Sequence, residues 1–177
     1  MARLPYQPHD STEPAPLLES IRRRRGGKLI NLDRMLLYSP PYAAGWNAFM
    51  GAVRSELALS PKLRELAMCG VAVLNGAEYE YLHHAPLFLQ AGGTEAQLEA
   101  LGDLEQAAQN AELFDTQELA AIRLTLEMTR SVRVSDETFA AAQAALPDHR
   151  QVVELAGVIA TYNMVSRFLV ALEIDPE

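Results

Sequence analysis

The fold of this protein is decided between Ser60 and Leu74, where the chain reads SPKLRELAMCGVAVL. Serine followed by proline is typical of the first turn of a helix, because proline there removes only an N–H that has no helical partner. The apolar residues that follow recur with the 3.6-residue period of one helix face. The pattern predicts an amphipathic helix that ends or bends at Asn75-Gly76.

Helical signals of the same kind extend over nearly the whole chain. Thr94–Gln97 reads as a capping box, and Asn31 and Ser135 are suited to cap the helices that follow them. No run of alternating apolar and polar residues indicates a sheet. We therefore predict an all-α fold, a single-domain multi-helix bundle of seven or eight helices over residues 15–177. Residues 1–14 are rich in proline and are expected to form an extended arm.

Composition and charge exclude several classes of protein. Apolar residues make up 49% and charged residues 21% of the chain, a balance that excludes wholesale disorder. No stretch approaches the roughly 18 consecutive apolar residues of a membrane-spanning helix, and the N-terminus lacks the apolar core of a signal peptide. The net charge of −8 argues against a nucleic-acid partner. We expect a soluble cytoplasmic protein with no membrane partner.

One basic cluster opposes the acidic balance. Arg22–Arg25 and Lys28 lie within seven residues and precede or flank Gly26-Gly27. Cations are favoured at the C-terminal end of a helix, and glycine is the usual stop. A helix end is therefore the favoured interpretation. A subunit contact and an anion site for a carboxylated ligand remain alternatives.

The residues best suited to chemistry lie around His84. Glu80 is four residues earlier and shares its helix face, where a carboxylate holds the tautomer of an imidazole and raises its pKa. The alternative is a surface pair that contributes only a few tenths of a kcal/mol. Pro86 favours a site, because it leaves the carbonyl of Leu82 without its helical partner.

The same segment carries aromatic residues and possible metal ligands. Tyr79 and Tyr81 suggest a pocket with apolar walls, although core packing would also explain them. Glu80-x-x-His83 is one half of a di-iron carboxylate motif, and the second half is missing. His83 and His84 point about 100° apart around a helix. We predict that no metal is bound.

The order of these residues resembles the carboxymuconolactone decarboxylase family, which includes the alkylhydroperoxidase D-like proteins. The resemblance rests on Ser60–Ala67, then Asn75–Tyr81 with His84, then Ala91–Thr94, and is dense over residues 40–105. It implies an all-helical subunit of the alkylhydroperoxidase D-like type. It also implies a homo-oligomer, a trimer or a hexamer.

The peroxidase branch of that family uses a glutamate, a Cys-x-x-Cys pair and a histidine four residues after the second cysteine. Counting back from His84 puts the two cysteines at Glu80 and Ala77, and the upstream glutamate matches Glu65. The chain has a single cysteine, Cys69, which matches neither position. Because disulfide exchange needs a thiolate and a resolving thiol, the resemblance implies a branch without dithiol peroxidase activity.

The decarboxylase branch carries a carboxylate and a histidine at the positions of Glu80 and His84 and needs no metal or organic cofactor. It releases CO₂ from a carboxylated lactone, so its site must stabilise a dienolate and protonate carbon. The family pattern leads us to expect a basic residue directly after the histidine. Here Ala85-Pro86 follow, so the particular lactone stays open.

The leading hypothesis is a cofactor-independent acid/base lyase or isomerase that acts on a small carboxylated lactone or carbonyl compound. His84 would be the acid/base, Glu65 and Glu80 would flank it, and Tyr79 or Tyr81 would bind an enolate oxygen.

The alternative from another class is a non-catalytic oligomeric ligand-binding protein. In that case Glu65 and His84 would persist as a buried structural ion pair. The discriminating observation is whether Glu65, Glu80 and His84 converge on a cavity that solvent reaches, because a sealed cluster favours the binding protein.

Overall fold

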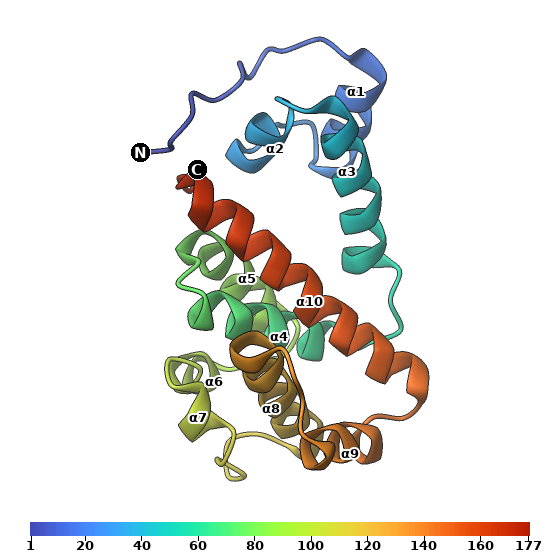
Figure 1. The fold of residues 1–177 in the computed structure, drawn as a ribbon, viewed down its shortest axis with the longest axis vertical. Coiled ribbons are helices and arrows are strands. Elements are labelled where there is room, and N and C mark those ends of the chain that lie inside the picture. Colours follow the sequence, from blue (N-terminus) through green and yellow to red (C-terminus); the bar gives the residue numbers. More distant parts are fainter. The chain divides into compact units, whose positions relative to one another are not determined.

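The computed structural model describes residues 1–177 and consists of helices joined by short connections, with no strand (Figure 1). The all-α prediction is confirmed. The ten helices are α1 (Ala15–Arg24), α2 (Asn31–Leu36), α3 (Pro40–Ser55), α4 (Pro61–Leu74), α5 (Glu78–Gln90), α6 (Glu95–Ala100), α7 (Leu104–Ala107), α8 (Thr116–Ser131), α9 (Asp136–Ala145) and α10 (His149–Leu172).

The number of helices exceeds the seven or eight expected. One of the additional helices, α7, is a single turn, too short for a 3.6-residue period to show in the sequence. It begins at Asp103, whose carboxylate accepts hydrogen bonds from the amides of Glu105 and Gln106. This turn therefore begins because Asp103 is a good N-cap, although its residues show no amphipathic period.

Residues group into two compact units, one of residues 1–56 with 169–177 and one of residues 57–168. Residues 1–14 of the first unit contain no helix, as an arm requires. All the candidate site residues named above lie in the second unit. The prediction of a single domain over residues 15–177 stays a prediction.

The predicted caps in the second unit form. The Ser60 hydroxyl accepts a hydrogen bond from the amide of Leu63 at 3.2 Å, with Pro61 as the first residue of α4. Thr94 and Gln97 form a reciprocal capping box at the start of α6. Ser135 caps α9 through the amide of Thr138. These helix starts follow from local sequence alone.

The predicted cap at Asn31 is wrong. Asn31 is already the first residue of α2, and its side chain instead donates to the carbonyl of Asp175. The amide of Ile30, one residue earlier, donates to the carboxylate of Asp33. The oxygen that would act as the cap, Asn31 Oδ1, accepts a hydrogen bond from Arg34 Nη1 at 2.9 Å instead.

The basic cluster at Arg22–Arg25 is a helix end, which was the favoured interpretation. The amide of Gly27 donates to the carbonyl of Arg22, and Gly26 and Gly27 have φ of +69° and +97°. Arg24 and Arg25 form ion pairs with Asp33, a carboxylate that is 1% exposed. The arginines thus neutralise a buried acid within the first unit.

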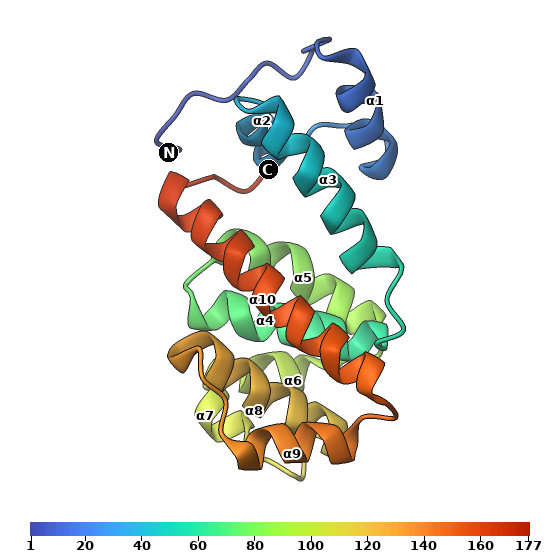
Figure 2. The same ribbon diagram turned by 45° about the vertical axis from the view of Figure 1, so that its right-hand side comes forward.

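Helix α4 is the centre of the second unit, with its most extensive contacts to α5 and α8. Helix α10 runs across α4 and α5 in both views of the ribbon (Figures 1 and 2). By length and hydropathy α10 could cross a membrane, but Leu155, Val158 and Ile159 of this helix are fully buried. It is a core helix that is buried on one side.

The Gly92-Gly93 pair that ends α5 has a steric reason. Gly92 has a φ of +96°, which favours glycine. A Cβ on Gly93 would lie 2.3 Å from the ring of Phe88, a fully buried residue of α5. The chain can therefore close over this ring only with glycine at position 93.

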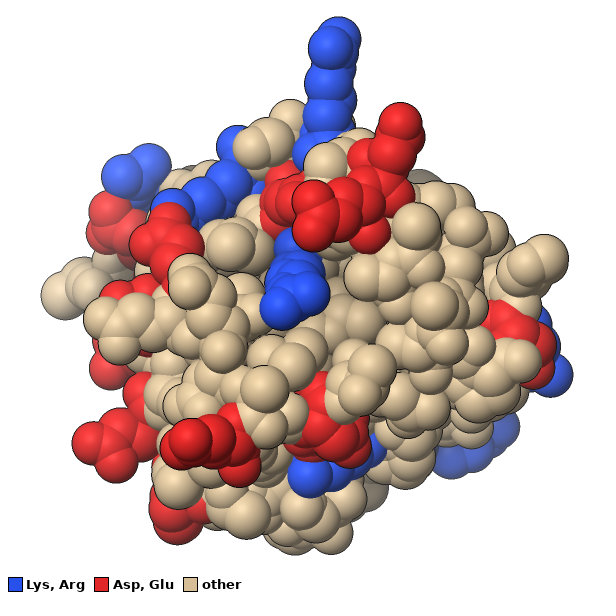
Figure 3. Space-filling model, turned by 90° about the horizontal axis from the view of Figure 1, so that it is seen from below, with Lys and Arg blue, Asp and Glu red and all other residues tan.

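Charged side chains of both signs lie on the face that Figure 3 shows, some of them next to one another and others separated by uncharged residues. No continuous basic patch is visible on this face. The expectation that the protein has no nucleic-acid partner stays a prediction.

Candidate functional site

Both ring nitrogens of His84 face carboxylates. His84 Nδ1 lies 2.5 Å from Glu65 Oε2, and His84 Nε2 lies 3.1 Å from Glu80 Oε2. Glu80 and His84 stand one turn apart on α5, while Glu65 reaches them from α4. The structure therefore brings together the three residues that the sequence analysis named as catalytic candidates.

The three side chains are buried at the contact between α4 and α5. His84 is 2%, Glu80 4% and Glu65 6% exposed. The edge of the His84 ring also meets Tyr162 of α10, with ring centroids 4.9 Å apart. Packing from three helices holds the imidazole in one orientation, so its two hydrogen bonds are fixed in direction.

The geometry favours a protonated imidazole. Each carboxylate oxygen accepts a hydrogen bond only from a nitrogen that carries hydrogen, and both nitrogens carry one only in the imidazolium form. Burial by itself lowers the pKa of His84, but the hydrogen bonds to Glu65 and then to Glu80, with their charges, outweigh it and raise this pKa. His84 is thus a proton donor held between two acceptors.

Sequence reasoning missed two residues that border this cluster. Tyr162 lies on α10, far along the chain, and no local sequence pattern indicates its contact with His84. Arg64 precedes Glu65 in α4, and its Nε lies 3.8 Å from Glu65 Oε1, beyond hydrogen-bond distance. That Nε–H is buried and makes no hydrogen bond. In the sequence, only its position directly before the candidate Glu65 could have indicated that Arg64 borders the cluster.

Cys69 lies one turn after Glu65 on α4 and is fully buried. Burial raises the pKa of its thiol to about 12, and the charges of Glu65 and Glu80 act in the same direction. A thiol in this setting stays protonated at neutral pH and is a poor nucleophile. Its neighbourhood is the opposite of the electropositive one that activates cysteines.

The two candidate tyrosines have different surroundings. Tyr79 is buried and stacks on the ring of His83, with centroids 4.3 Å apart, and its carbonyl accepts a hydrogen bond from His83 Nδ1. Tyr81 is partly exposed, and burial together with the nearby Cys69 and Glu95 raises the pKa of its phenol. Tyr81 is therefore the tyrosine placed to meet a molecule from solvent.

Tyr81 lines two open depressions in the surface. One of about 470 Å³ includes Ala85 and Pro86, and the other of about 370 Å³ includes Ala77 and Gly76. Their walls are largely apolar, with Leu98 and Glu99 of α6 shared by both. Glu65, Glu80 and His84 line neither depression, so the expected pocket at these residues stays a prediction.

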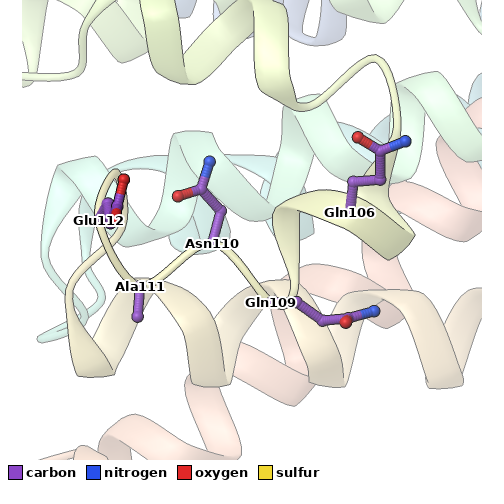
Figure 4. Close-up of a pocket in the computed structure, with 5 residues that line it drawn as sticks. All are labelled: Gln106, Gln109, Asn110, Ala111 and Glu112. Carbon is purple, nitrogen blue, oxygen red and sulfur yellow. The ribbon is translucent and has the colours of Figure 1, made fainter.

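A third depression, of about 460 Å³, lies at the connection between α7 and α8 (Figure 4). Asn110 there accepts a hydrogen bond from the amide of Leu113, and Gln109 donates to the carbonyl of Glu105. The lining contains no histidine. It offers hydrogen-bonding groups without an acid/base pair.

No group of three or more His, Cys, Asp or Glu side chains is arranged to hold a metal ion. Both nitrogens of His84 already face carboxylates, and Nδ1 of His83 faces a carbonyl. The expectation of a site without metal or organic cofactor stays a prediction.

Comparisons with known proteins agree with the family resemblance. The model of the "Carboxymuconolactone decarboxylase family" matches residues 40–115, a segment that contains Glu65, Glu80 and His84. No curated protein matches the chain.

Solved structures share the fold at low sequence identity. A peroxidase-related protein from Silicibacter sp. TM1040 is 19% identical, with a TM-score of 0.79 over 99% of this chain and 90% of its own. A peroxidase-related protein from Ralstonia eutropha JMP134, described as an alkylhydroperoxidase AhpD core, is 15% identical, with a TM-score of 0.82 over 99% and 92%. A variant of the debrominase Bmp8 in complex with 2,3,4-tribromopyrrole is 15% identical, with a TM-score of 0.80 over 100% and 94%.

The raised pKa of His84 predicts a pH-dependent stability. Because this pKa lies above its ordinary value of 6.5, the cluster stabilises the fold fully below about pH 6.5 and loses that contribution as the pH rises through the folded-state pKa. The excess stability of the wild type over His84→Gln should therefore fall between pH 6 and pH 9, by about 1.4 kcal/mol for each unit that separates the two pKa values. Urea unfolding at each pH measures it.

The matched control for the pH series is His149→Gln, which removes an exposed imidazole elsewhere in the second unit. A stability difference between wild type and His84→Gln that stays constant or grows towards pH 9 would contradict the assignment of an imidazolium.

The burial of Cys69 predicts an inert thiol. With a pKa of about 12, only about one thiol in 10⁴ or fewer is ionised at pH 7.5. Labelling by a thiol-reactive disulfide should be at least about 10³-fold slower in the native protein than in guanidinium. Peroxide turnover should be equally low in wild type, Cys69→Ser and Cys69→Ala. Rapid native labelling together with turnover that both substitutions remove would restore the thiol peroxidase hypothesis.

Proposed function

We propose that this chain is a cofactor-independent acid/base lyase or isomerase, a proposal that the match of residues 40–115 to the model of the carboxymuconolactone decarboxylase family supports. Its substrate class is a small carboxylated lactone or carbonyl compound, and its location is the cytoplasm. The observation that carries the proposal is the imidazole of His84 held between Glu65 and Glu80.

The proposed reaction needs a proton donor more than it needs a nucleophile. When the bond from the carboxylate to the lactone breaks, CO₂ leaves and the electron pair enters a dienolate. The imidazolium of His84 then donates a proton to carbon, and solvent restores the proton afterwards. An isomerase would first need a base, so the carboxylate of Glu80 would remove a proton from one carbon and the imidazolium of His84 would donate a proton to another. Proton transfer between Glu80 and His84 would then restore both groups. The protonated, oriented imidazole thus supplies the donor that both reactions need.

The two glutamates are suited to different roles. Glu65 Oε2 makes the shorter contact, 2.5 Å to Nδ1, and comes from a different helix, so it orients the ring. Glu80 Oε2 lies 3.1 Å from His84 Nε2. Because this contact is longer and weaker, the proton on Nε2 is more readily donated to a substrate. We assign Nε2 as the donating nitrogen, with Glu80 as the group that exchanges protons with it.

One observation favours the alternative, a non-catalytic ligand-binding protein. The three side chains are nearly sealed, which is the condition that the sequence analysis set for a structural cluster. Against this, a structural pair requires one carboxylate for each imidazolium, and a second buried carboxylate adds a desolvation cost without a second cation in hydrogen-bond contact. Surplus charge of this kind is typical of functional sites. The two hypotheses differ in whether His84 transfers a proton to a bound molecule.

The test compares His84→Gln with His83→Gln. Glutamine keeps some hydrogen bonding but cannot titrate, so turnover should fall at least about 10²-fold for His84→Gln and change little for His83→Gln, whose ring points elsewhere on α5. A panel of carboxylated butenolides and β-keto acids is assayed for CO₂ release and for deuterium uptake at carbon in D₂O. Chelator-washed protein should keep full activity.

Thermal unfolding of both variants confirms that the fold is intact. Equal losses from the two substitutions, or turnover in His84→Gln at the wild-type rate, would exclude His84 as the acid/base. Binding of a panel compound without any proton exchange would favour the ligand-binding alternative.

We also propose that the chain forms a homo-oligomer, a trimer or a hexamer, as the family resemblance implies. Large apolar side chains on the surface support this, among them Val153 and Met164 of α10 and Leu82 of α5. Light scattering at micromolar concentration should give a multiple of the 19.5 kDa chain mass. A mass of one chain would contradict it.

A further inference from the structure

Arg64 is a cation that the structure leaves without a hydrogen-bond partner. Its side chain is 13% exposed, and its Nε–H is buried without an acceptor. The nearest acid is Glu65, whose Oε1 is 3.8 Å from Arg64 Nε. Buried N–H groups of a guanidinium ordinarily donate to carboxylates or carbonyls, so one that has only a long ion pair and no hydrogen bond needs an explanation.

Other cations of this chain show the usual arrangement. Arg25 Nε lies 3.1 Å from Asp33, and Lys62 Nζ lies 2.6 Å from Glu118. Lys62 is two residues from Arg64 on the same helix, and its acid comes from α8. Glu65 lies farther from Arg64 than these acids lie from their cations, and its Oε2 is held at 2.5 Å by His84 Nδ1.

The charge of the cluster makes such a cation useful to an anionic substrate. Glu65 and Glu80 together repel a carboxylate that approaches His84, and the single positive charge of the imidazolium offsets only one of them. The position after the histidine, where the family pattern led us to expect a basic residue, holds Ala85. A cation at the Glu65 side would balance the second carboxylate and attract the substrate.

We propose that Arg64 binds the carboxylate of an anionic substrate of the Glu65–His84–Glu80 site. The guanidinium is planar and presents parallel N–H donors, so it binds a carboxylate with two hydrogen bonds where a lysine makes a point contact. Arg64 is thus the residue that selects acids over neutral compounds, and it compensates for Ala85. This inference rests on the proposed function and adds to it the source of substrate recognition.

Two probes isolate the carboxylate: a butenolide that carries a carboxymethyl group, and the methyl ester of the same compound. Calorimetry gives the dissociation constant of each for the wild type, Arg64→Gln and Arg133→Gln. Arg133→Gln is the matched control, because it removes an exposed arginine from the connection between α8 and α9 and changes the net charge equally. Circular dichroism melting checks that each variant folds.

The wild type should bind the acid at least about tenfold more tightly than the ester, a typical effect of one charge-assisted bidentate contact. Arg64→Gln should lose this preference, because the substitution weakens binding of the acid and leaves binding of the ester unchanged. Arg133→Gln should keep it. Arg64→Lys should keep part of the preference, because lysine retains the positive charge but lacks the parallel N–H donors of the guanidinium.

Equal binding of acid and ester by the wild type, or an unchanged preference in Arg64→Gln, would overturn the assignment. If Arg64→Gln does not fold, Arg64→Lys decides: a reduced preference supports the assignment, and a preference equal to that of the wild type overturns it.

Deuterium uptake by the ester separates this inference from the proposed function, because that uptake requires His84 and not the substrate carboxylate. If His84→Gln abolishes deuterium exchange and the wild type binds acid and ester equally, the acid/base site is supported and the role of Arg64 is excluded. If the preference for the acid depends on Arg64 but no exchange occurs, the role of Arg64 is supported and the proposed function is excluded.

Discussion

The hydrogen bond between His84 Nδ1 and Glu65 Oε2 is the interaction on which the site depends, because it joins α5 to α4 across the centre of the second unit. It fixes the orientation of the imidazole and leaves Nε2 as the nitrogen that can exchange a proton with Glu80. It also occupies Oε2 of Glu65, while Oε1 lies 3.8 Å from Arg64 Nε, too far for a hydrogen bond. The proposed roles of His84, Glu80 and Arg64 therefore all depend on this one contact.

Part of this site could be predicted from the sequence and part could not. Glu80 and His84 follow from four-residue spacing on one helix, and the starts of α4 and α6 follow from local caps at Ser60 and Thr94. Glu65 is on another helix, and only the family resemblance pointed to it. Tyr162 could not be found, since its contact with His84 depends on how α10 packs.

The failures in the fold have similar causes. The turn α7 is too short to show a period, and its start depends on a single aspartate. Asn31 is a good cap by type, but its Oδ1 accepts from Arg34 and its Nδ2 donates to the carbonyl of Asp175, which is remote in sequence. Local chemistry thus predicts a cap where no other group binds the same side chain, and it fails where one does.

Two positions separate this site from the dithiol peroxidase pattern, because Ala77 and Glu80 stand where that pattern has cysteines. The carboxylate at position 80 also changes the surroundings of His84. A cysteine there would lie one turn before His84 and could use the imidazole as a base to form a thiolate. Glu80 accepts a hydrogen bond from the same Nε2 and keeps the imidazole protonated, so the histidine becomes an acid. The same carboxylate, with Glu65, helps raise the pKa of Cys69 and suppresses the one thiol that remains. The arrangement therefore favours proton transfer and disfavours electron transfer at the same place in the fold.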